Sequence, residues 1–223
     1  MADKRPGVLS LVLIPAILTL IVSILRLVGQ MQGWNETVFG KAEPGGSGAI
    51  LGIGWLIVIF GLYFGVRMQR AGHGTKSPTR ALVLTLVGLG LTIGGAIVMN
   101  QGGYLTFPGT LESPANPVGV EYLMAAIGAG VLFCFIAWPR LALTLLVYAI
   151  LARIPVVIIT WLALHYGWDG THYTKTPPEF AQPTDDERFM FLAMAQATIW
   201  PAATIMGGSL FGCLGALMAK KKG

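Results

Sequence analysis

The stretch RLALTLLVYAILARIPVVIITWLALHYGWDGTHY, residues 140–173, decides the fold, because it joins a membrane-length apolar run to one internal charge and a polar end. Between Leu141 and Leu164 the only formally charged side chain is that of Arg153, about 18 Å in from Leu141 at 1.5 Å per residue. That depth is close to the middle of a hydrocarbon layer about 30 Å thick. The pattern predicts a transmembrane helix with a guanidinium in its middle.

The composition of the whole chain indicates a polytopic membrane protein. Of its 223 residues, 54% are hydrophobic and 11% are charged, whereas about a quarter of the residues in a soluble domain are charged. The net charge of +5 comes from short basic segments between apolar runs. We therefore interpret it as an orientation signal and expect no nucleic-acid partner. Cys134 and Cys213 both fall inside apolar runs, so no disulfide framework is indicated.

Six apolar runs predict an all-α bundle of six transmembrane helices, forming a single integral membrane domain over residues 1–223. The expected spans are 8–28, 49–66, 81–99, 120–138, 141–164 and 189–219. The long connection 166–188 is rich in proline and aromatic residues, and we expect it to fold as an outer cap. Arg26 lies near the end of the first span, so it is expected to reach the headgroups by snorkelling.

Basic residues near the span ends predict the orientation. With the N-terminus in the cytoplasm, the inner side holds ten basic residues, namely Lys4, Arg5, Arg67, Arg70, Lys76, Arg80, Arg140, Lys220, Lys221 and Lys222. The outer side holds three, namely Lys41, Lys175 and Arg188. This asymmetry follows the positive-inside rule, so both termini are expected in the cytoplasm, and the expected location is a bacterial inner membrane.

Glycines recur at four-residue spacing within the spans. The pairs are Gly61 with Gly65, Gly90 with Gly94, and Gly208 with Gly212. Small residues at this spacing let helix backbones approach closely. The favoured interpretation is packing inside the bundle, and the alternative is a seam between copies of a homo-oligomer.

Arg153 carries the strongest functional signal, because a charge in mid-membrane costs at least about 2.5 kcal/mol and normally faces protein or water. Three interpretations stay open. In the first, its guanidinium donates to the carbonyl of Leu151, which Pro155 leaves without a donor, and stabilises a kink there. In the second, it forms a binding site for an anion, a headgroup or a substrate. In the third, its side chain snorkels. The candidate binding residues are Arg153, Tyr148, Gln196, Trp200 and Thr204.

Prolines inside three of the expected spans predict kinks at Pro15, Pro155 and Pro201. Pro201 lies at a depth comparable with that of Arg153 in the neighbouring antiparallel span. Broken helices that face each other near the midplane form binding sites in many transporters. A cavity between the fifth and sixth spans is one consequence to test, although prolines also occur in membrane helices without such a role.

A possible metal site follows the fifth span. His165, Asp169 and His172 combine imidazole and carboxylate ligands that suit zinc. Gly167 and Gly170 lie between them and argue against one continuous helix presenting all three. An aromatic belt of Tyr166, Trp168 and Tyr173 is the favoured interpretation of this segment.

These features leave three functional hypotheses. The leading one is a non-catalytic membrane protein, an accessory or scaffolding subunit of a membrane assembly, because the chain is small and has no Gly-x-Ser-x-Gly, His-Glu-x-x-His, paired intramembrane aspartates or P-loop. The alternative is a small transporter or a carrier of lipid or anion with its site around Arg153. The third is a membrane enzyme that uses the outer His and Asp residues with zinc; otherwise no cofactor is expected. The expected partners are the lipid bilayer and other membrane subunits or further copies of this chain.

Overall fold

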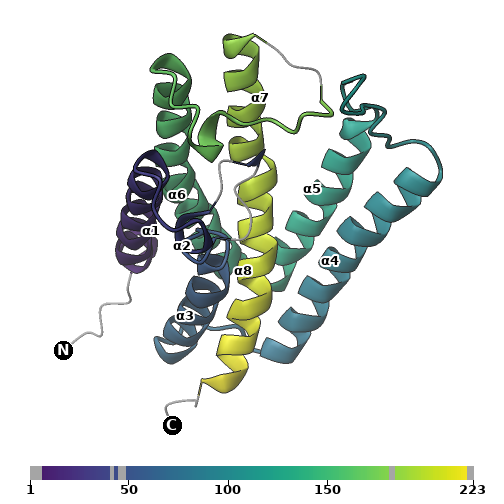
Figure 1. The fold of residues 1–223 in the computed structure, drawn as a ribbon. Helices are drawn as coiled ribbons and strands as arrows, with labels where there is room; N and C mark the ends of the chain where they lie inside the picture. The colour runs from purple at the N-terminus through teal and green to yellow at the C-terminus, as the bar shows by residue number, and fades with distance from the viewer. Residues whose placement is uncertain (1–6, 41–42, 45–48, 181–183, 220–223) are drawn as a thin grey trace.

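Helices account for nearly all of the regular structure in the computed structural model, which describes residues 7–40, 43–44, 49–180 and 184–219 (Figure 1). The elements are α1 (Val8–Met31), α2 (Glu36–Phe39), α3 (Leu56–Arg70), α4 (Pro78–Gln101), α5 (Val120–Ala137), α6 (Pro139–His165), the 3-10 helix η2 (His172–Thr174), α7 (Asp185–Ala197) and α8 (Ile199–Met218). The all-α fold class is therefore confirmed.

Five helical stretches among the described residues are long and apolar enough to cross a membrane. They are α1, α4, α5, α6 and the stretch Asp185–Met218 that α7 and α8 form together. This agrees with the predicted helical membrane protein. The helix α3 is shorter, at 15 residues, and begins at Leu56 rather than at Ala49. Gly52 and Gly54 fall in the turns before it, where glycine disfavours a helix.

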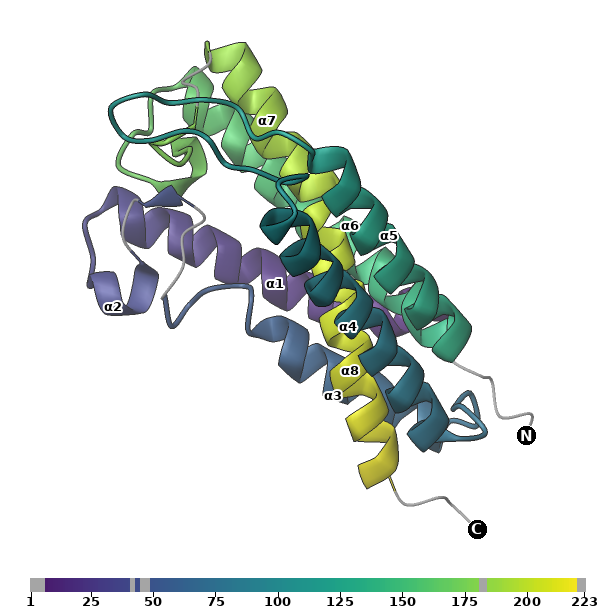
Figure 2. The same cartoon turned by 90° about the vertical axis from the view of Figure 1, so that its right-hand side faces the viewer.

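Helix α8 lies in the middle of the bundle, with α3 on one side and α4 and α5 on the other (Figures 1 and 2). Glycines allow the close approach of α3. A Cβ atom on Gly61 would lie 2.8 Å from the carbonyl oxygen of Gly208, and one on Gly65 would collide with the carbonyl of Gly212. These two pairs pack inside the bundle, as favoured from the sequence. A Cβ atom on Gly90 or on Gly94 would meet nothing within 4 Å.

The last long helical stretch breaks at Thr198, whose backbone has φ −121° and ψ −70°. Pro201 explains the break, because it has no N–H to donate to the carbonyl of Ala197 and its ring crowds that carbonyl. The two other predicted kink positions, Pro15 and Pro155, lie within α1 and α6, and both helices continue past them.

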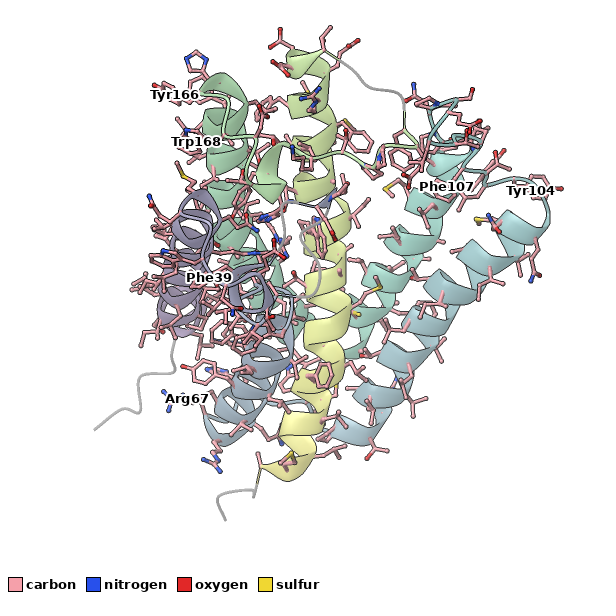
Figure 3. All side chains as sticks on the ribbon, viewed as in Figure 1. Phe39, Arg67, Tyr104, Phe107, Tyr166 and Trp168 are labelled. Carbon is pink, nitrogen blue, oxygen red and sulfur yellow. The ribbon has the colours of Figure 1, made fainter. Side chains whose placement is uncertain are left out.

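The two ends of the bundle differ in character. Arg67 and Arg70 lie in the last turn of α3 and Arg140 in the first turn of α6, at the end where α8 finishes (Figures 1 and 3). At the opposite end, Figure 3 shows Tyr166 and Trp168. The predicted positions outside the described residues are Lys4, Arg5, Lys41, residues 181–183 of the expected cap, Lys220, Lys221 and Lys222.

Two connections meet at this aromatic end. The backbone N–H of Ala115 donates to the carbonyl of Glu179 at 3.1 Å. The rings of Phe107 and Phe180 stack with their centroids 6.3 Å apart. These contacts join the α4–α5 connection to the segment that follows η2.

Candidate functional site

Arg153 lies deep within α6, about 18 Å from the His165 end and about 21 Å from the Pro139 end at 1.5 Å per residue. Its side chain is 7% exposed. Among the described residues, no carboxylate lies within ion-pair distance of it. The guanidinium is therefore buried without a counter-charge from the described protein.

Neutral groups contact this guanidinium. Its Nη1 donates to Oε1 of Gln196 at 3.2 Å, and its Cζ lies 4.9 Å from the ring centroid of Trp200. Its Nε is buried and has no hydrogen-bond partner among the described residues. Within the same part of the chain, Arg153 does not donate to the carbonyl of Leu151, so the bond that the kink interpretation requires is not seen.

A cavity of about 480 Å³ lies beside Arg153. Side chains from α1, α6, α7 and α8, the segment 49–55 and the region around η2 line it. Its basic lining residues are Arg26, Arg153 and Lys175, and no Asp or Glu of the described chain lines it. Val156, Phe191 and Leu192 are among the apolar residues of its wall. The cavity is therefore positively charged and partly apolar, and its size is typical of small-molecule sites.

Arg26 faces this cavity rather than the headgroups, which corrects the expectation that it snorkels. Its side chain is only 5% exposed, and its Nε donates to the carbonyl of Phe39 at 3.0 Å. The short helix α2 folds back against the end of α1 (Figure 2). The sequence rule fails here because this local fold covers the side chain with protein.

Gln30 holds three segments together beside Arg26. Its Nε2 donates to the carbonyl oxygens of Phe39 and Gly40 at 3.1 and 3.3 Å. Its Oε1 lies 3.2 Å from the backbone N of His172 and 2.8 Å from Nδ1 of the same residue. An amide oxygen only accepts, so Nδ1 of His172 carries the proton. Gln30 thus fixes η2 against α1.

The ionisation of the η2 residues follows from their burial. Loss of hydration, with a smaller effect from the positive charge of Arg26, lowers the pKa of His172 to about 3. Burial raises the pKa of Tyr173 to about 12, although Arg26 and Arg153 oppose this shift. Both side chains are therefore neutral at physiological pH. The positive charge of the cavity comes from its two arginines and Lys175.

The structure brings together three of the five predicted binding residues. Arg153, Gln196 and Trp200 line the cavity, whereas Tyr148 and Thr204 do not. The Tyr148 hydroxyl lies 2.8 Å from Oγ1 of Thr19 in the α1–α6 interface. The Thr204 hydroxyl donates to the carbonyl of Trp200 at 2.8 Å and supports the first turn of α8.

The three residues proposed as zinc ligands are not brought together. His165 stacks on Trp161 with centroids 5.2 Å apart, and His172 is bound to Gln30. Within the described chain, no group of three His, Cys, Asp or Glu side chains is placed to hold a metal ion. The geometry therefore gives the zinc hypothesis no ligand set.

Sequence reasoning missed the contributions of Arg26, His172, Tyr173 and Lys175 to the cavity. Arg26 had a usable signal, since it is also a charged residue inside a long apolar run. The others had none, because their placement depends on contacts between residues more than 140 positions apart, such as that of Gln30 with His172.

No family model matches this chain, and neither a curated protein nor a solved structure is significantly similar to it. Its function is therefore argued from the site alone.

Proposed function

We propose that this chain is a small membrane protein that binds an anionic group, a carboxylate or a phosphate, in the cavity beside Arg153. The observation that carries the proposal is the uncompensated guanidinium: it is buried, its Nε is unpartnered among the described residues, and it borders a cavity with two further basic side chains. An anion supplies the missing counter-charge.

The chemistry of arginine favours this ligand class. Its planar guanidinium presents several N–H donors in a fork that matches carboxylate and phosphate oxygens. Near a protein surface, a pair of unit charges about 4 Å apart attract each other by about 4 kcal/mol, and exclusion of water strengthens the attraction. Trp200 covers one face of the guanidinium and Gln196 engages Nη1, so both restrict its orientation. The charge is thus held in place before a ligand arrives.

The geometry favours this role over the other sequence-based hypotheses. An accessory or scaffolding subunit remains a prediction from the sequence, but it gives no reason for a charged cavity inside the bundle. A metal enzyme lacks a ligand set among the described residues.

The proposal includes a topology of six crossings, with both termini in the cytoplasm and the segment 166–188 as an outer cap. Five helical stretches have the length for a crossing. We propose α3 as the remaining one, since its 15 residues span about 22 Å and the turns at 49–55 continue from it. Arg67, Arg70 and Arg140 then face the cytoplasm, as the positive-inside rule requires.

Titration calorimetry of the purified protein with glycerol 1-phosphate tests the binding function. The wild type is expected to bind, and Arg153→Gln is expected to lose at least about tenfold in affinity, because each tenfold step corresponds to only about 1.4 kcal/mol. Arg70→Gln is the matched control, since it removes the same charge from an exposed position at the far end of α3. Equal affinities for these two variants would falsify the proposal.

Gln196→Glu provides a second variant in case Arg153→Gln fails to fold. It puts a carboxylate where Oε1 of Gln196 now lies 3.2 Å from Nη1 of Arg153. The built-in anion should compete with the ligand, so binding should fall while thermal stability is kept. Binding of glycerol 1-phosphate at wild-type affinity by a folded Gln196→Glu protein contradicts an anion site at Arg153.

A further inference from the structure

A groove lies on the other side of Arg153 and opens on the side surface of the bundle, away from its core. This groove has a volume of about 330 Å³ and runs between α6 and the junction of α7 with α8. Arg153 and Gln196 line both the groove and the 480 Å³ cavity. The hydrogen-bonded pair that they form is therefore the boundary between the two spaces.

The groove is apolar apart from this pair. Ile150, Ile154 and Ile158 lie along its α6 wall at four-residue spacing, which places them on one helix face. They are 47%, 50% and 52% exposed, so this face points away from the bundle core. The three residues cover about 12 Å along α6. In a membrane-spanning helix such a face is surrounded by hydrocarbon.

The break in the last helical stretch forms the opposite wall. Ala197 and Pro201 line the groove and flank Thr198, where the helix is interrupted. The helix α7 has no fully buried residue among those described, whereas Ala202, Thr204 and Ile205 of α8 are buried. The groove therefore lies where this stretch changes from a helix without a fully buried residue to one with a buried face.

We infer that the ligand is an anionic lipid, whose acidic headgroup binds Arg153 in the cavity and whose acyl chain lies in the groove. This inference rests on the proposed function and specifies the class of its ligand. An amphiphile matches both spaces at once, because the cavity holds the guanidinium of Arg153, which has no counter-charge among the described residues, and the groove is apolar and faces the hydrocarbon. The lipid reaches the cavity sideways, between α6 and α7.

The energetics assign different roles to the two spaces. Moving an acyl chain from the bilayer into the groove gains little, because lipid tails are as apolar as the isoleucines. Selection therefore comes from the headgroup at Arg153. The chain acts as a tether that keeps the headgroup at high local concentration without requiring transfer of an ion from water. A soluble anion with the same headgroup should consequently bind more weakly than the lipid.

Photolabelling tests the inference in phosphatidylcholine nanodiscs that contain phosphatidate with a diazirine on one acyl chain. Irradiation followed by peptide mapping is expected to place the label on the α6 segment Ile150–Ile158. An excess of unlabelled phosphatidate should reduce this labelling at least fivefold, and an equal excess of phosphatidylcholine should not. Labelling spread evenly over the exposed helices, with no competition by phosphatidate, overturns the inference.

Groove-filling variants separate this inference from the proposed function. Ile154→Trp and Ile158→Trp fill the groove without touching the cavity, and Leu143→Trp is the matched control on a part of α6 outside both spaces, where Leu143 is 45% exposed. The two groove variants should reduce photolabelling at least fivefold and leave the affinity for glycerol 1-phosphate within twofold of wild type. Leu143→Trp should change neither.

The outcomes distinguish the two claims. If the groove variants keep full photolabelling while Arg153→Gln still has a reduced affinity for glycerol 1-phosphate, the lipid inference is wrong and the anion site stands. If Arg153→Gln leaves the binding of glycerol 1-phosphate unchanged, both claims fail together.

Discussion

The guanidinium carbon of Arg153 lies 4.9 Å from the centroid of the Trp200 ring, so a buried cation on α6 rests on the first turn of α8. The break at Thr198 lies just before Trp200. A cation on an aromatic face gains about 0.5–1 kcal/mol when exposed and about 2 kcal/mol or more when desolvated. This contact offsets part of the cost of burying the charge and leaves Nε unpartnered among the described residues.

Trp200→Leu is expected to lower the free energy of unfolding by about 2 kcal/mol, because it removes the aromatic face under a desolvated cation. Trp200→Phe keeps an aromatic ring and should cost less. Equilibrium unfolding in mixed detergent micelles measures both. Trp161→Leu is the control, since Trp161 is 50% exposed on α6 and does not line the cavity. Equal losses for Trp200→Leu and Trp200→Phe would show that the ring does not stabilise Arg153.

The pH dependence of stability should report on His172. Its pKa falls from 6.5 to about 3 on folding, so between these values the unfolded chain binds a proton that the folded chain does not. Stability is thus constant above about pH 6.5 and is lost as the pH falls toward 3, by up to about 1.4 kcal/mol per pH unit. Thermal unfolding should show a loss of about 2 kcal/mol between pH 7.5 and 5.

Two histidine variants identify the group responsible. His172→Asn keeps a donor near the position of Nδ1 for Gln30 but does not titrate in this range, so the pH dependence should disappear. His165→Gln should keep it, because the substitution leaves the contact between His172 and Gln30 in place. If the stability of His172→Asn falls with pH as steeply as that of the wild type, another group causes the pH dependence.

Arg153 and some of its neighbours could be predicted from the sequence, because a single charge inside an apolar run needs polar or aromatic partners from neighbouring helices. Trp200 adjoins Pro201, which lies at a comparable depth in the antiparallel span, and Gln196 is among the candidate binding residues; both contact Arg153. Tyr148 is also among the candidate binding residues but faces Thr19 on α1, since an apolar run does not show which helix face a residue occupies. The contact of Gln30 with His172 depends on how two connections fold, which no local pattern encodes.

The close approach of α3 and α8 predicts an asymmetric response to alanine. Gly65→Ala should cost about 1–3 kcal/mol, the usual range for overpacking, because its Cβ collides with the carbonyl of Gly212. Gly90→Ala should be neutral or stabilising, since its Cβ meets nothing within 4 Å and alanine favours a helix. Unfolding in mixed micelles gives both values. A loss for Gly90→Ala comparable with that for Gly65→Ala would point to a seam between copies at α4.

Cysteine labelling in intact cells tests the topology, and three positions suffice. Glu43 follows α1, Lys76 lies between α3 and α4, and Glu112 lies between α4 and α5. With six crossings, a membrane-impermeant maleimide should label Glu43→Cys and Glu112→Cys from outside, and Lys76→Cys only after permeabilisation. Cys134 and Cys213 are buried and should give no background.

If α3 does not cross, Glu43→Cys and Lys76→Cys will label from the same side, because α4 alone then separates both from Glu112→Cys. Labelling of Lys76→Cys from outside, with Glu43→Cys and Glu112→Cys labelled only after permeabilisation, would reverse the proposed orientation and put the basic end of the bundle outside the cell.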